Sequence, residues 1–476
     1  MNRPNHRKTL ALLGAAAALA GAAAFLGRPG AASTPPTVDP PSNACAGGAP
    51  ARDSRSFGAG QMTAALSAGS VLVGGDGTVY ASIDLDAAEA AAAERPPMSV
   101  AIVIDHSGSM EGEPLARAKA AARGLVERLG SRDHAAVVQY DSTAEVLVAA
   151  IPVDTEGKAR LLAAIDSIRD RGGTNIGAGL ELGRDEVLKG LGPGRVNRLI
   201  LLSDGNANEG LLTVPEFARL ASNAAERGVR ISAVGLGDSY NEDLMQAVAE
   251  HGRGRYYYAQ DATALEAVFA GELKALAGTV ATQAELRLTP ACGAEIVEVF
   301  GYETRRDGGT TIVPLADLAG GDRRKIVARV RVPAGAAGRE NVLTATFGHS
   351  GAKGGERTSV AIVLGVEVTR DADKVAAAAD KDVLGKVAQA ESSVTLRKAA
   401  DAYAAGDRGA ALRLVEEQKQ RTASMAKMYR LEPAKVAPAD KPLETFAGAV
   451  QAAPPAAEPA PALTKRAKAD AYELAK

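Results

Sequence analysis

The sequence comprises 476 residues, of which 46% are hydrophobic and 24% are charged. These are the proportions of an ordinary globular protein, and the length is sufficient for two or three domains. With 55 Lys and Arg residues against 57 Asp and Glu residues, the formal net charge is −2, which excludes a global field favouring nucleic acid or an anionic membrane. The absence of Trp and an aromatic share of 4% argue against surfaces that stack on bases or sugars.

The amino terminus carries a basic segment followed by an apolar one. MNRPNHRK precedes the apolar stretch Thr9–Leu26, and small residues follow it, with a plausible cleavage point near Ala32 or Ser33. This pattern predicts a secretory signal over residues 1–32. Because the apolar stretch is long for a signal, an uncleaved membrane anchor is the alternative. In either case we expect the rest of the chain to be exported to the periplasm, the cell envelope or the extracellular space.

The sequence contains two cysteines, Cys45 and Cys292. An oxidising compartment would permit a disulfide between them, and two unpaired thiols are the alternative. Their spacing fits neither a redox CxxC motif nor a zinc site. Residues 33–58, in which Cys45 lies, are rich in Pro, Ser, Gly and Ala and predict a disordered linker.

Two separate parts of the chain have the alternating pattern of β-strands. Residues 59–96 contain two such segments around a Gly-Gly-Asp-Gly turn signal. Residues 279–370 contain a longer series with Gly-rich turns, which predicts a β-sandwich-like domain. Since the early strands lack partners of their own, we expect them to join the later sheet.

Between these β segments, strands and amphipathic helices alternate over residues 97–278. Ser99–Ile104 and Asn197–Leu202 have the composition of strands that are buried on both faces of a parallel sheet. His134–Tyr140 and Ala144–Ala150 predict an antiparallel hairpin. The predicted fold class is therefore α/β, a Rossmann-like, doubly wound and mostly parallel sheet inserted between the β segments.

The carboxyl-terminal part is predicted to be helical. Residues 371–432 indicate an α-helical hairpin around a turn at Gly406-Asp407. One segment, AADAYAAGDRGAALRLVEE, is similar to half of a tetratricopeptide unit, but a single unit forms no repeat array, so a generic packed hairpin is expected. Residues 433–476 predict a Pro/Ala-rich tail that is flexible over residues 433–462 and ends in a short helix.

Oxygen-bearing side chains follow several of the predicted strands and loops. Asp105, Ser107 and Ser109 follow the first strand of the α/β unit, Thr174 lies in a Gly-rich loop, and Asp204 follows a later strand. We expect them to meet at the edge formed by the carboxyl ends of the strands. Two carboxylates and three hydroxyls suit Mg²⁺, with Mn²⁺ or Ca²⁺ as alternatives, rather than zinc. Because hydroxyl ligands are neutral, such a cation could also accept a carboxylate from another molecule.

The sequence DHSGSM, together with GGTNIGAGL and LLSDGNAN, resembles the metal-ion-dependent adhesion site of von Willebrand factor A (VWA) domains. The resemblance covers the whole α/β unit. It implies that Ser107, Ser109 and Thr174 contact the cation directly, whereas Asp105 and Asp204 act through water. It also implies a protein partner that offers an acidic side chain.

The same region, with its opening RPPMSVAIVIDHSGSM and its β flanks, is similar to inter-alpha-trypsin-inhibitor heavy chains, which implies a non-enzymatic role. The sequence lacks GxSxG, Walker, HExxH and CxxC motifs, so no catalytic residue is predicted. His106, at the variable place of the DxSxS motif, is interpreted as a packing or solvent-facing residue rather than a ligand.

Metal-dependent adhesion or protein interaction is the leading functional interpretation. The alternative is an envelope assembly or signalling scaffold in which the metal is structural and the helical carboxyl-terminal region recruits partners. An enzyme, such as a subunit of a metal-chelatase machine, is disfavoured because export removes the chain from cytoplasmic ATP. Neither leading interpretation involves nucleic acid, and contact with a membrane is expected only through an uncleaved amino-terminal segment.

Overall fold

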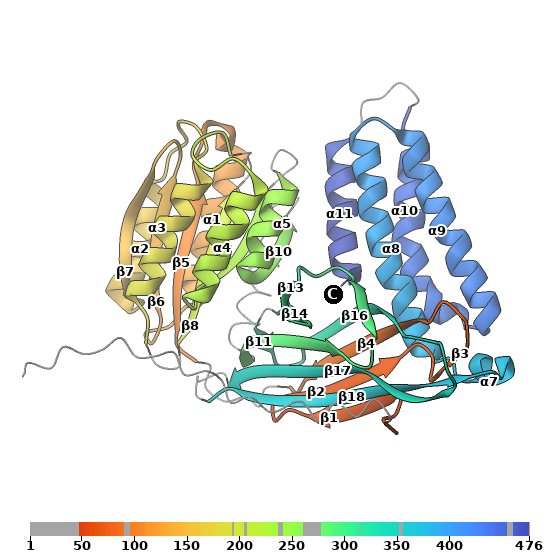
Figure 1. Ribbon diagram of the computed structural model, residues 1–476. Helices are drawn as coiled ribbons and strands as arrows, with labels where there is room; N and C mark the ends of the chain where they lie inside the picture. The colour runs from red at the N-terminus through yellow and green to blue at the C-terminus, as the bar shows by residue number, and fades with distance from the viewer. Residues whose placement is uncertain are drawn as a thin grey trace, which may run out of the picture. The chain divides into compact units, whose positions relative to one another are not determined.

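The computed structural model describes nine stretches of the chain, which together form a β-sandwich, an α/β domain and a set of carboxyl-terminal helices (Figure 1). These stretches are residues 47–89, 96–192, 195–203, 207–236, 241–259, 278–315, 317–351, 356–454 and 460–475. The expected signal over residues 1–32, Cys45 and Asp204 lie outside them. Within the described stretches, no helix combines the length and apolar character needed to cross a bilayer.

The α/β domain is built on a six-stranded sheet with the order β10-β9-β8-β5-β6-β7. All neighbouring strands are parallel except β6 and β7, which form the expected antiparallel hairpin at one edge. The strands are β5 (Met98–Asp105), β6 (His134–Tyr140), β7 (Ala144–Pro152), β8 (Val196–Ser203), β9 (Arg230–Leu236) and β10 (Arg253–Ala259).

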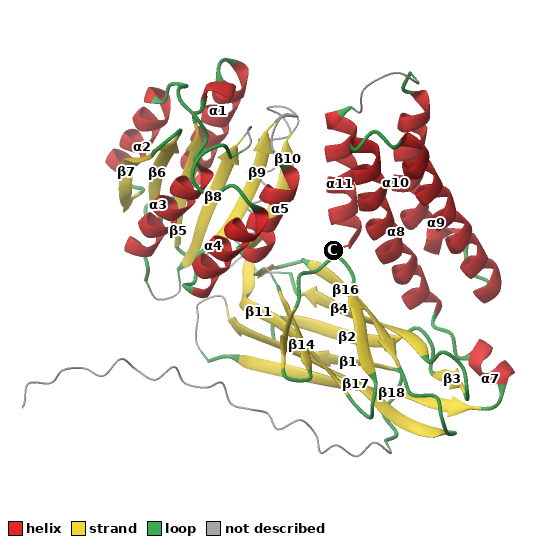
Figure 2. Cartoon of the chain, turned by 45° about the horizontal axis from the view of Figure 1, so that its top comes forward, coloured by secondary structure: helices red, strands yellow, loops and turns green. Residues whose placement is uncertain are grey.

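Helices cover both faces of this sheet (Figure 2), because successive side chains of a strand point to opposite sides. In β5, Val100, Ile102 and Ile104 pack into one core with α1 and α2, whereas Ala101 and Val103 pack into a second core with α3, α4 and α5. The predicted doubly wound fold is therefore confirmed. The helices are α1 (Glu113–Arg128), α2 (Thr155–Ser167), α3 (Ile176–Lys189), α4 (Val214–Glu226) and α5 (Glu242–His251).

The β-sandwich combines strands from before and after the α/β domain. Its five-stranded sheet has the order β1-β2-β4-β16-β12, in which Ile83 of β4 lies opposite Ile326 of β16. This pairing confirms that the α/β domain is inserted between β segments that share a sheet. The strands are β1 (Arg52–Ser56), β2 (Gly60–Leu66), β4 (Thr78–Ala87), β12 (Glu295–Val299) and β16 (Arg323–Arg331).

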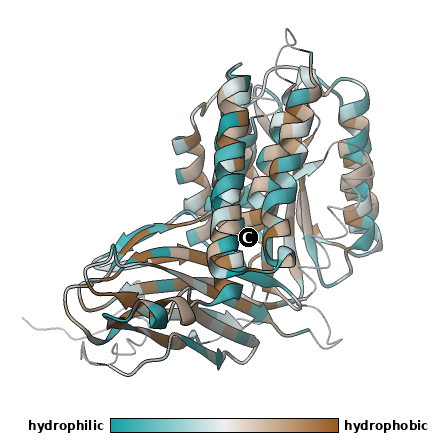
Figure 3. Cartoon of the chain, turned by 90° about the vertical axis from the view of Figure 1, so that its right-hand side faces the viewer, coloured by the Kyte–Doolittle hydropathy of each residue, from teal (hydrophilic) through white to brown (hydrophobic). Residues whose placement is uncertain are grey.

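A second sheet, of seven strands, faces the first across an apolar core that includes Met62, Leu286 and Phe347. Along the strands of both sheets, hydrophobic and hydrophilic residues follow one another (Figure 3), as expected for a sandwich with one buried face per sheet. The strands of this sheet are β3 (Ser70–Leu72), β11 (Thr279–Pro290), β13 (Arg305–Asp307), β14 (Thr310–Pro314), β15 (Leu318–Ala319), β17 (Gly338–Gly351) and β18 (Thr358–Thr369).

One strand of the sandwich lies in the segment that was expected to be a disordered linker. Arg52–Ser56 forms β1, which pairs with β2 along its whole length. The segment has little apolar surface to bury, but this edge strand is held by backbone hydrogen bonds and leaves most of its side chains in solvent. The expected linker over residues 33–58 therefore does not extend through this strand.

The carboxyl-terminal helices include the expected hairpin, made by α8 and α9, which turns at Gly406 with a φ of 85°. Residues 433–452, expected to be flexible, instead form helix α10. Its Leu443, Phe446 and Val450 recur at helical spacing and are buried against α8 and α9, which outweighs the two internal prolines. The helices are α7 (Ala372–Ala377), α8 (Lys381–Ala404), α9 (Arg408–Tyr429), α10 (Pro433–Ala452) and α11 (Pro461–Ala475).

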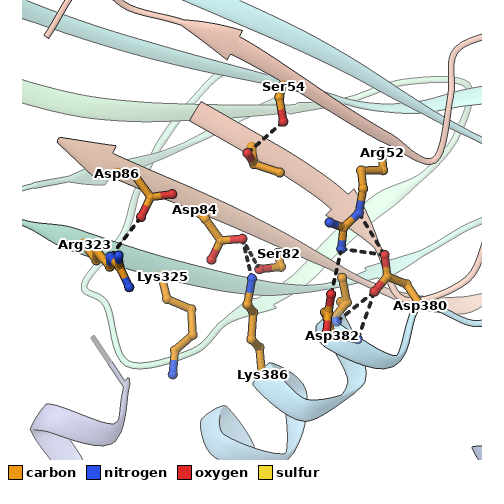
Figure 4. Close-up of polar contacts among 12 residues, drawn as sticks. Arg52, Ser54, Ser82, Asp84, Asp86, Arg323, Lys325, Asp380, Asp382 and Lys386 are labelled. Carbon is orange, nitrogen blue, oxygen red and sulfur yellow. Dashed lines mark hydrogen bonds and ion pairs between the residues drawn. The ribbon is translucent and has the colours of Figure 1, made fainter. Parts of the chain in front are cut away.

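Polar contacts join the start of α8 to the sandwich (Figure 4). Asp380 caps α8 by accepting hydrogen bonds from the backbone of Asp382 and Val383. The same carboxylate accepts a 2.7 Å bond from Arg52 of β1. The ordered strand β1 thus also anchors the first long carboxyl-terminal helix.

Candidate metal-binding site

Asp105, the last residue of β5, has a completely buried side chain. Its Oδ1 accepts a 2.9 Å hydrogen bond from the backbone N–H of Ser107. Its Oδ2 accepts bonds from the hydroxyls of Ser203 at 2.8 Å and Tyr140 at 3.2 Å. Burial raises the pKa of Asp105, although these hydrogen bonds oppose the shift. No Lys, Arg or His among the described residues forms an ion pair with this carboxylate.

The two serines of the motif lie on a short loop directly after Asp105. The Ser107 and Ser109 hydroxyl oxygens are 3.2 Å apart, with Ser107 buried and Ser109 exposed. Between them, the N–H of Gly108 donates to the carbonyl of Gly172 at 3.1 Å. The serine loop is therefore tied to the Gly-rich loop that carries Thr174.

Thr174 is buried just before α3, where two loops meet. Its N–H donates to the side-chain oxygen of Asn208 at 2.7 Å, and its carbonyl accepts the Asn208 N–H at 3.1 Å. This reciprocal pair fixes the Gly-rich loop against the loop after β8. The Thr174 hydroxyl makes no hydrogen bond with any residue that the structure describes.

Of the five predicted site residues, four are described: Asp105 ends strand β5, and Ser107, Ser109 and Thr174 lie on loops that hydrogen bonds hold together. Asp204 is outside the described residues, directly after the end of β8 at Ser203. Among the described residues, no three His, Cys, Asp or Glu side chains gather into a group that could hold a metal. The predicted site has two carboxylates and three hydroxyls, so it is not a group of that kind.

Sequence reasoning missed Asp141, which organises the Gly-rich loop. Its carboxylate accepts a 2.8 Å bond from Arg171 Nε and further bonds from the backbone and hydroxyl of Thr143. Burial raises its pKa, but the hydrogen bonds from Thr143 and Arg171 lower the pKa below its ordinary value. The position of Asp141 directly after strand β6, like that of Asp105 after β5, was the signal that could have identified it.

His106 is a buried packing residue. Its side chain is 3% exposed, and Nδ1 lies 2.7 Å from the carbonyl oxygen of Arg169, to which it donates. Nε2 lies 3.9 Å from the nearer carboxylate oxygen of Asp141. The ring therefore connects the serine loop to the Gly-rich loop and to the turn after β6.

Residues 99–271 match the von Willebrand factor type A domain family. Together with the doubly wound sheet, this match shows that the inserted α/β unit is a VWA domain.

Several proteins are similar to this part of the chain. YfbK of Escherichia coli (strain K12) is 33% identical over 228 residues, which are 47% of this chain and 39% of that protein. The protein sll0103 of Synechocystis is 30% identical, covering 47% of this chain and 54% of that protein. Inter-alpha-trypsin inhibitor heavy chain H3 of Rattus norvegicus is 28% identical, over 40% of this chain and 22% of that protein. The chain thus spans about half or less of the length of these relatives.

Two solved structures share more of the architecture. A von Willebrand factor type A protein from Catenulispora acidiphila superposes with a TM-score of 0.63 at 20% identity, over 79% of this chain and 91% of that one. The ArnB paralog VWA2 from Sulfolobus acidocaldarius has a TM-score of 0.53 at 17% identity, over 86% and 97%. At these identities the likeness concerns the fold.

Proposed function

We propose that the VWA domain is an adhesion or protein-interaction module that binds Mg²⁺, or Mn²⁺ or Ca²⁺ in its place, and through it an acidic side chain of a protein ligand. Asp105, Ser107, Ser109, Thr174 and Asp204 would hold the cation. The observation that carries this proposal is the fully buried Asp105 carboxylate, which has no cationic partner among the described residues. A buried charge without a partner is costly, and a divalent cation would remove that cost.

The donor set fits a small hard cation. Hydroxyl and carboxylate oxygens are the ligands that Mg²⁺ and Ca²⁺ prefer, and the Ser107 and Ser109 hydroxyls already lie side by side. When bound, the cation supplies a Lewis-acidic position for a carboxylate. The chain itself holds the loops in place, through the Gly108–Gly172 bond and the pair between Thr174 and Asn208.

Calorimetric titration of Mg²⁺ into chelator-stripped protein tests the site. We expect the wild type to bind and Asp105→Ala to lose binding, with the far-UV circular dichroism and melting temperature in chelator largely retained, since a rim metal is not needed to fill the core. Thr174→Ala is a second variant, because its hydroxyl makes no bond that folding would lose. Unchanged binding in both variants contradicts the assignment.

The ligand half of the proposal needs a separate experiment. Crosslinking to envelope proteins, with and without chelator, should give adducts that require Mg²⁺ and vanish in Asp105→Ala. Substitution of acidic residues by amides in the captured protein should then abolish binding. Capture that persists in chelator but disappears on deletion of residues 374–476 would instead favour the scaffold function.

Export of the chain is part of the same proposal, because a ligand in the envelope must meet the domain there. The support is the basic and apolar amino terminus. Cell fractionation should find the chain outside the cytoplasm, and amino-terminal sequencing of the mature protein would separate cleavage near Ala32 from retention as an anchor.

A further inference from the structure

A second candidate site is a cavity beside the amino-terminal end of β10. Asp105 lies at the other side of the sheet, where the carboxyl ends of the strands lie. The volume of the cavity is about 280 Å³, which suits a small organic molecule. It is lined by α5 and β10 of the VWA domain, by the sandwich and by α11. The residues that matter for its chemistry are Arg253, Tyr256, Tyr302, Leu315 and Tyr472.

Aromatic rings form much of the wall. Tyr256 and Tyr472 meet edge to face, with ring centroids 5.9 Å apart and an interplanar angle of 83°. The Tyr302 hydroxyl donates to the carbonyl of Lys325 at 3.3 Å, which fixes that ring as well. Leu315 adds an aliphatic surface and is itself held in the sandwich core. The walls therefore favour a flat or branched apolar body.

Four arginines line the cavity, and acids neutralise three of them. Arg255 and Arg324 both donate to Asp322, at 2.7 and 3.1 Å. A further 2.7 Å bond joins Arg305 to the carboxylate of Glu285.

Arg253, the fourth arginine, makes no hydrogen bond or ion pair with any residue that the structure describes. Glutamates that also line the cavity do not neutralise it. Glu226, Glu303 and Glu473 are exposed at the rim, and Glu250 accepts a 3.0 Å bond from Gln246.

The backbone around Arg253 is held in an unfavourable conformation. Arg253 has a φ of 52°, in the left-handed region that costs a non-glycine residue about 1 kcal/mol or more. Its pairing with β9 is irregular as far as Tyr256. Such strain persists only where the surroundings impose it, and here it fixes an arginine at the cavity wall.

Neighbouring arginines and carboxylates both act on the charge of Arg253. Burial is the largest cause that lowers the pKa of Arg253, and repulsion from Arg230 and Arg305 lowers it further. The attraction of Glu285 and Asp317 raises the pKa by less. An anion in the cavity would relieve this repulsion.

We propose that the cavity binds a small organic carboxylate. Its carboxylate group would pair with the planar guanidinium of Arg253, which presents two parallel N–H donors. Its aromatic or branched apolar body would lie against Tyr256, Tyr302 and Tyr472. This site is independent of the metal at the other edge of the sheet.

Phenylacetate is the probe that tests the proposal, by calorimetric titration into the full chain. Chelator is present throughout, so that the carboxylate has no metal to coordinate. We expect saturable binding of phenylacetate, and binding of the uncharged phenylacetamide that is at least about tenfold weaker, because it forms no charged pair. The same affinities should be found for Asp105→Ala, which separates this site from the proposed metal site.

Variants of the cavity complete the test. Arg253→Gln should weaken phenylacetate binding about tenfold or more, Arg253→Lys should fall between it and the wild type, and the exposed Arg323→Gln should leave binding unchanged. If Arg253→Gln fails to fold, Thr304→Trp narrows the cavity at an exposed rim position and should also weaken binding. No saturable binding of phenylacetate up to about 10 mM, or equal binding to the wild type and these cavity variants, overturns the proposal.

Discussion

The Asp105 carboxylate is oriented by hydroxyl groups from the strands on either side of its own. Tyr140 is the last residue of β6 and Ser203 the last residue of β8, and these two strands flank β5 in the sheet. Both hydroxyls donate to the same carboxylate oxygen. Residues that act in this way would tune the proposed metal site without touching the metal.

Removing one of these donors should weaken the proposed metal site without unfolding the domain. Tyr140→Phe keeps the buried ring and deletes the hydroxyl 3.2 Å from Asp105. We expect Mg²⁺ affinity to fall about tenfold, the lower end of the effect of such outer contacts. Calorimetry measures the loss, with Tyr429→Phe in α9 as the matched control. Equal affinity in both variants would show that the hydroxyl does not position Asp105.

Lys325 gives the stability of the protein a specific pH dependence. Burial, joined by repulsion from Lys386 and opposed by attraction to Asp84, lowers its pKa to about 8. Figure 4 shows the three side chains near one another. An unfolded lysine has a pKa of about 10.4, so between about pH 8 and 10.4 the unfolded chain binds the proton that the folded chain has lost. The free energy of unfolding should therefore rise with pH across this window. Below about pH 8 the charged, buried Lys325 destabilises the folded state most.

Lys325→Met should remove this rise. Nζ also donates to Gln389 and to the carbonyl of Leu474, and losing these bonds offsets part of the gain. We expect the variant to be more stable than the wild type by about 1–2 kcal/mol at pH 7, with the difference shrinking toward pH 10. Urea denaturation at a series of pH values measures it. The exposed Lys381→Met is the control, and a constant difference across the series would contradict the assignment.

At the scale of elements, the sequence predicts secondary structure best where the composition of a segment by itself shows that it is buried. Val100–Ile104 is apolar on both faces, and it forms the central buried strand β5. For Arg52–Ser56 and residues 433–452 the sequence predicted disorder or flexibility. Their charged or proline-rich composition does not show that a neighbouring strand or helix stabilises them. β1 depends on the backbone of β2, and α10 on the apolar faces of α8 and α9.

The dependence of α10 on the apolar faces of α8 and α9 can be tested directly. Phe446 is buried and meets Tyr403 edge to face at 6.0 Å between ring centroids. Phe446→Ala should cost about 3–4 kcal/mol of bundle stability through the cavity that it leaves. Thr445→Ala, on the exposed side of the same helix, should stay within about 0.5 kcal/mol of the wild type. Urea titration followed by circular dichroism compares them, and similar curves would mean that this segment is not packed.

In the candidate metal site too, some residues could be predicted from local sequence and others only from the folded structure. Asp105, Ser107 and Ser109 form one short motif, and Thr174 is marked by its Gly-rich loop, so local sequence sufficed to propose them. Tyr140 lies in no motif, and within LLSDGNAN the sequence assigned a role to Asp204 but none to Ser203 or Asn208. The roles of Tyr140, Ser203 and Asn208 follow from strand order and loop contacts, which only the folded chain displays.

At the scale of the whole molecule, buried lysines connect α11 to two other helices. Lys468, 6% exposed at its side chain, pairs with Glu242 and Asp243 of α5 and with Asp401 of α8, at 2.8 to 3.1 Å. Lys465 adds a 2.8 Å bond to Glu242. These contacts tie the VWA domain to the carboxyl-terminal helices by charge.

Lys468→Met should loosen α11. We expect a loss of about 1–3 kcal/mol, because three carboxylates lose their shared cation, two of them at half-exposed positions that water partly compensates. Hydrogen exchange of the α11 amides should become faster, whereas Arg466→Met on the exposed side of the helix should leave exchange unchanged. Unaltered protection in Lys468→Met would show that apolar packing alone holds the helix.

The pairing of β4 with β16 means that both ends of the VWA domain continue into one sandwich. A ligand that pulls on the domain therefore loads two covalent connections at once, and each bears part of the tension. A single peptide-bond cleavage in either connection leaves the domain attached through the other. For a module proposed to hold on to a partner outside the cell, this double attachment is a mechanical safeguard that a domain at the end of a single linker does not have.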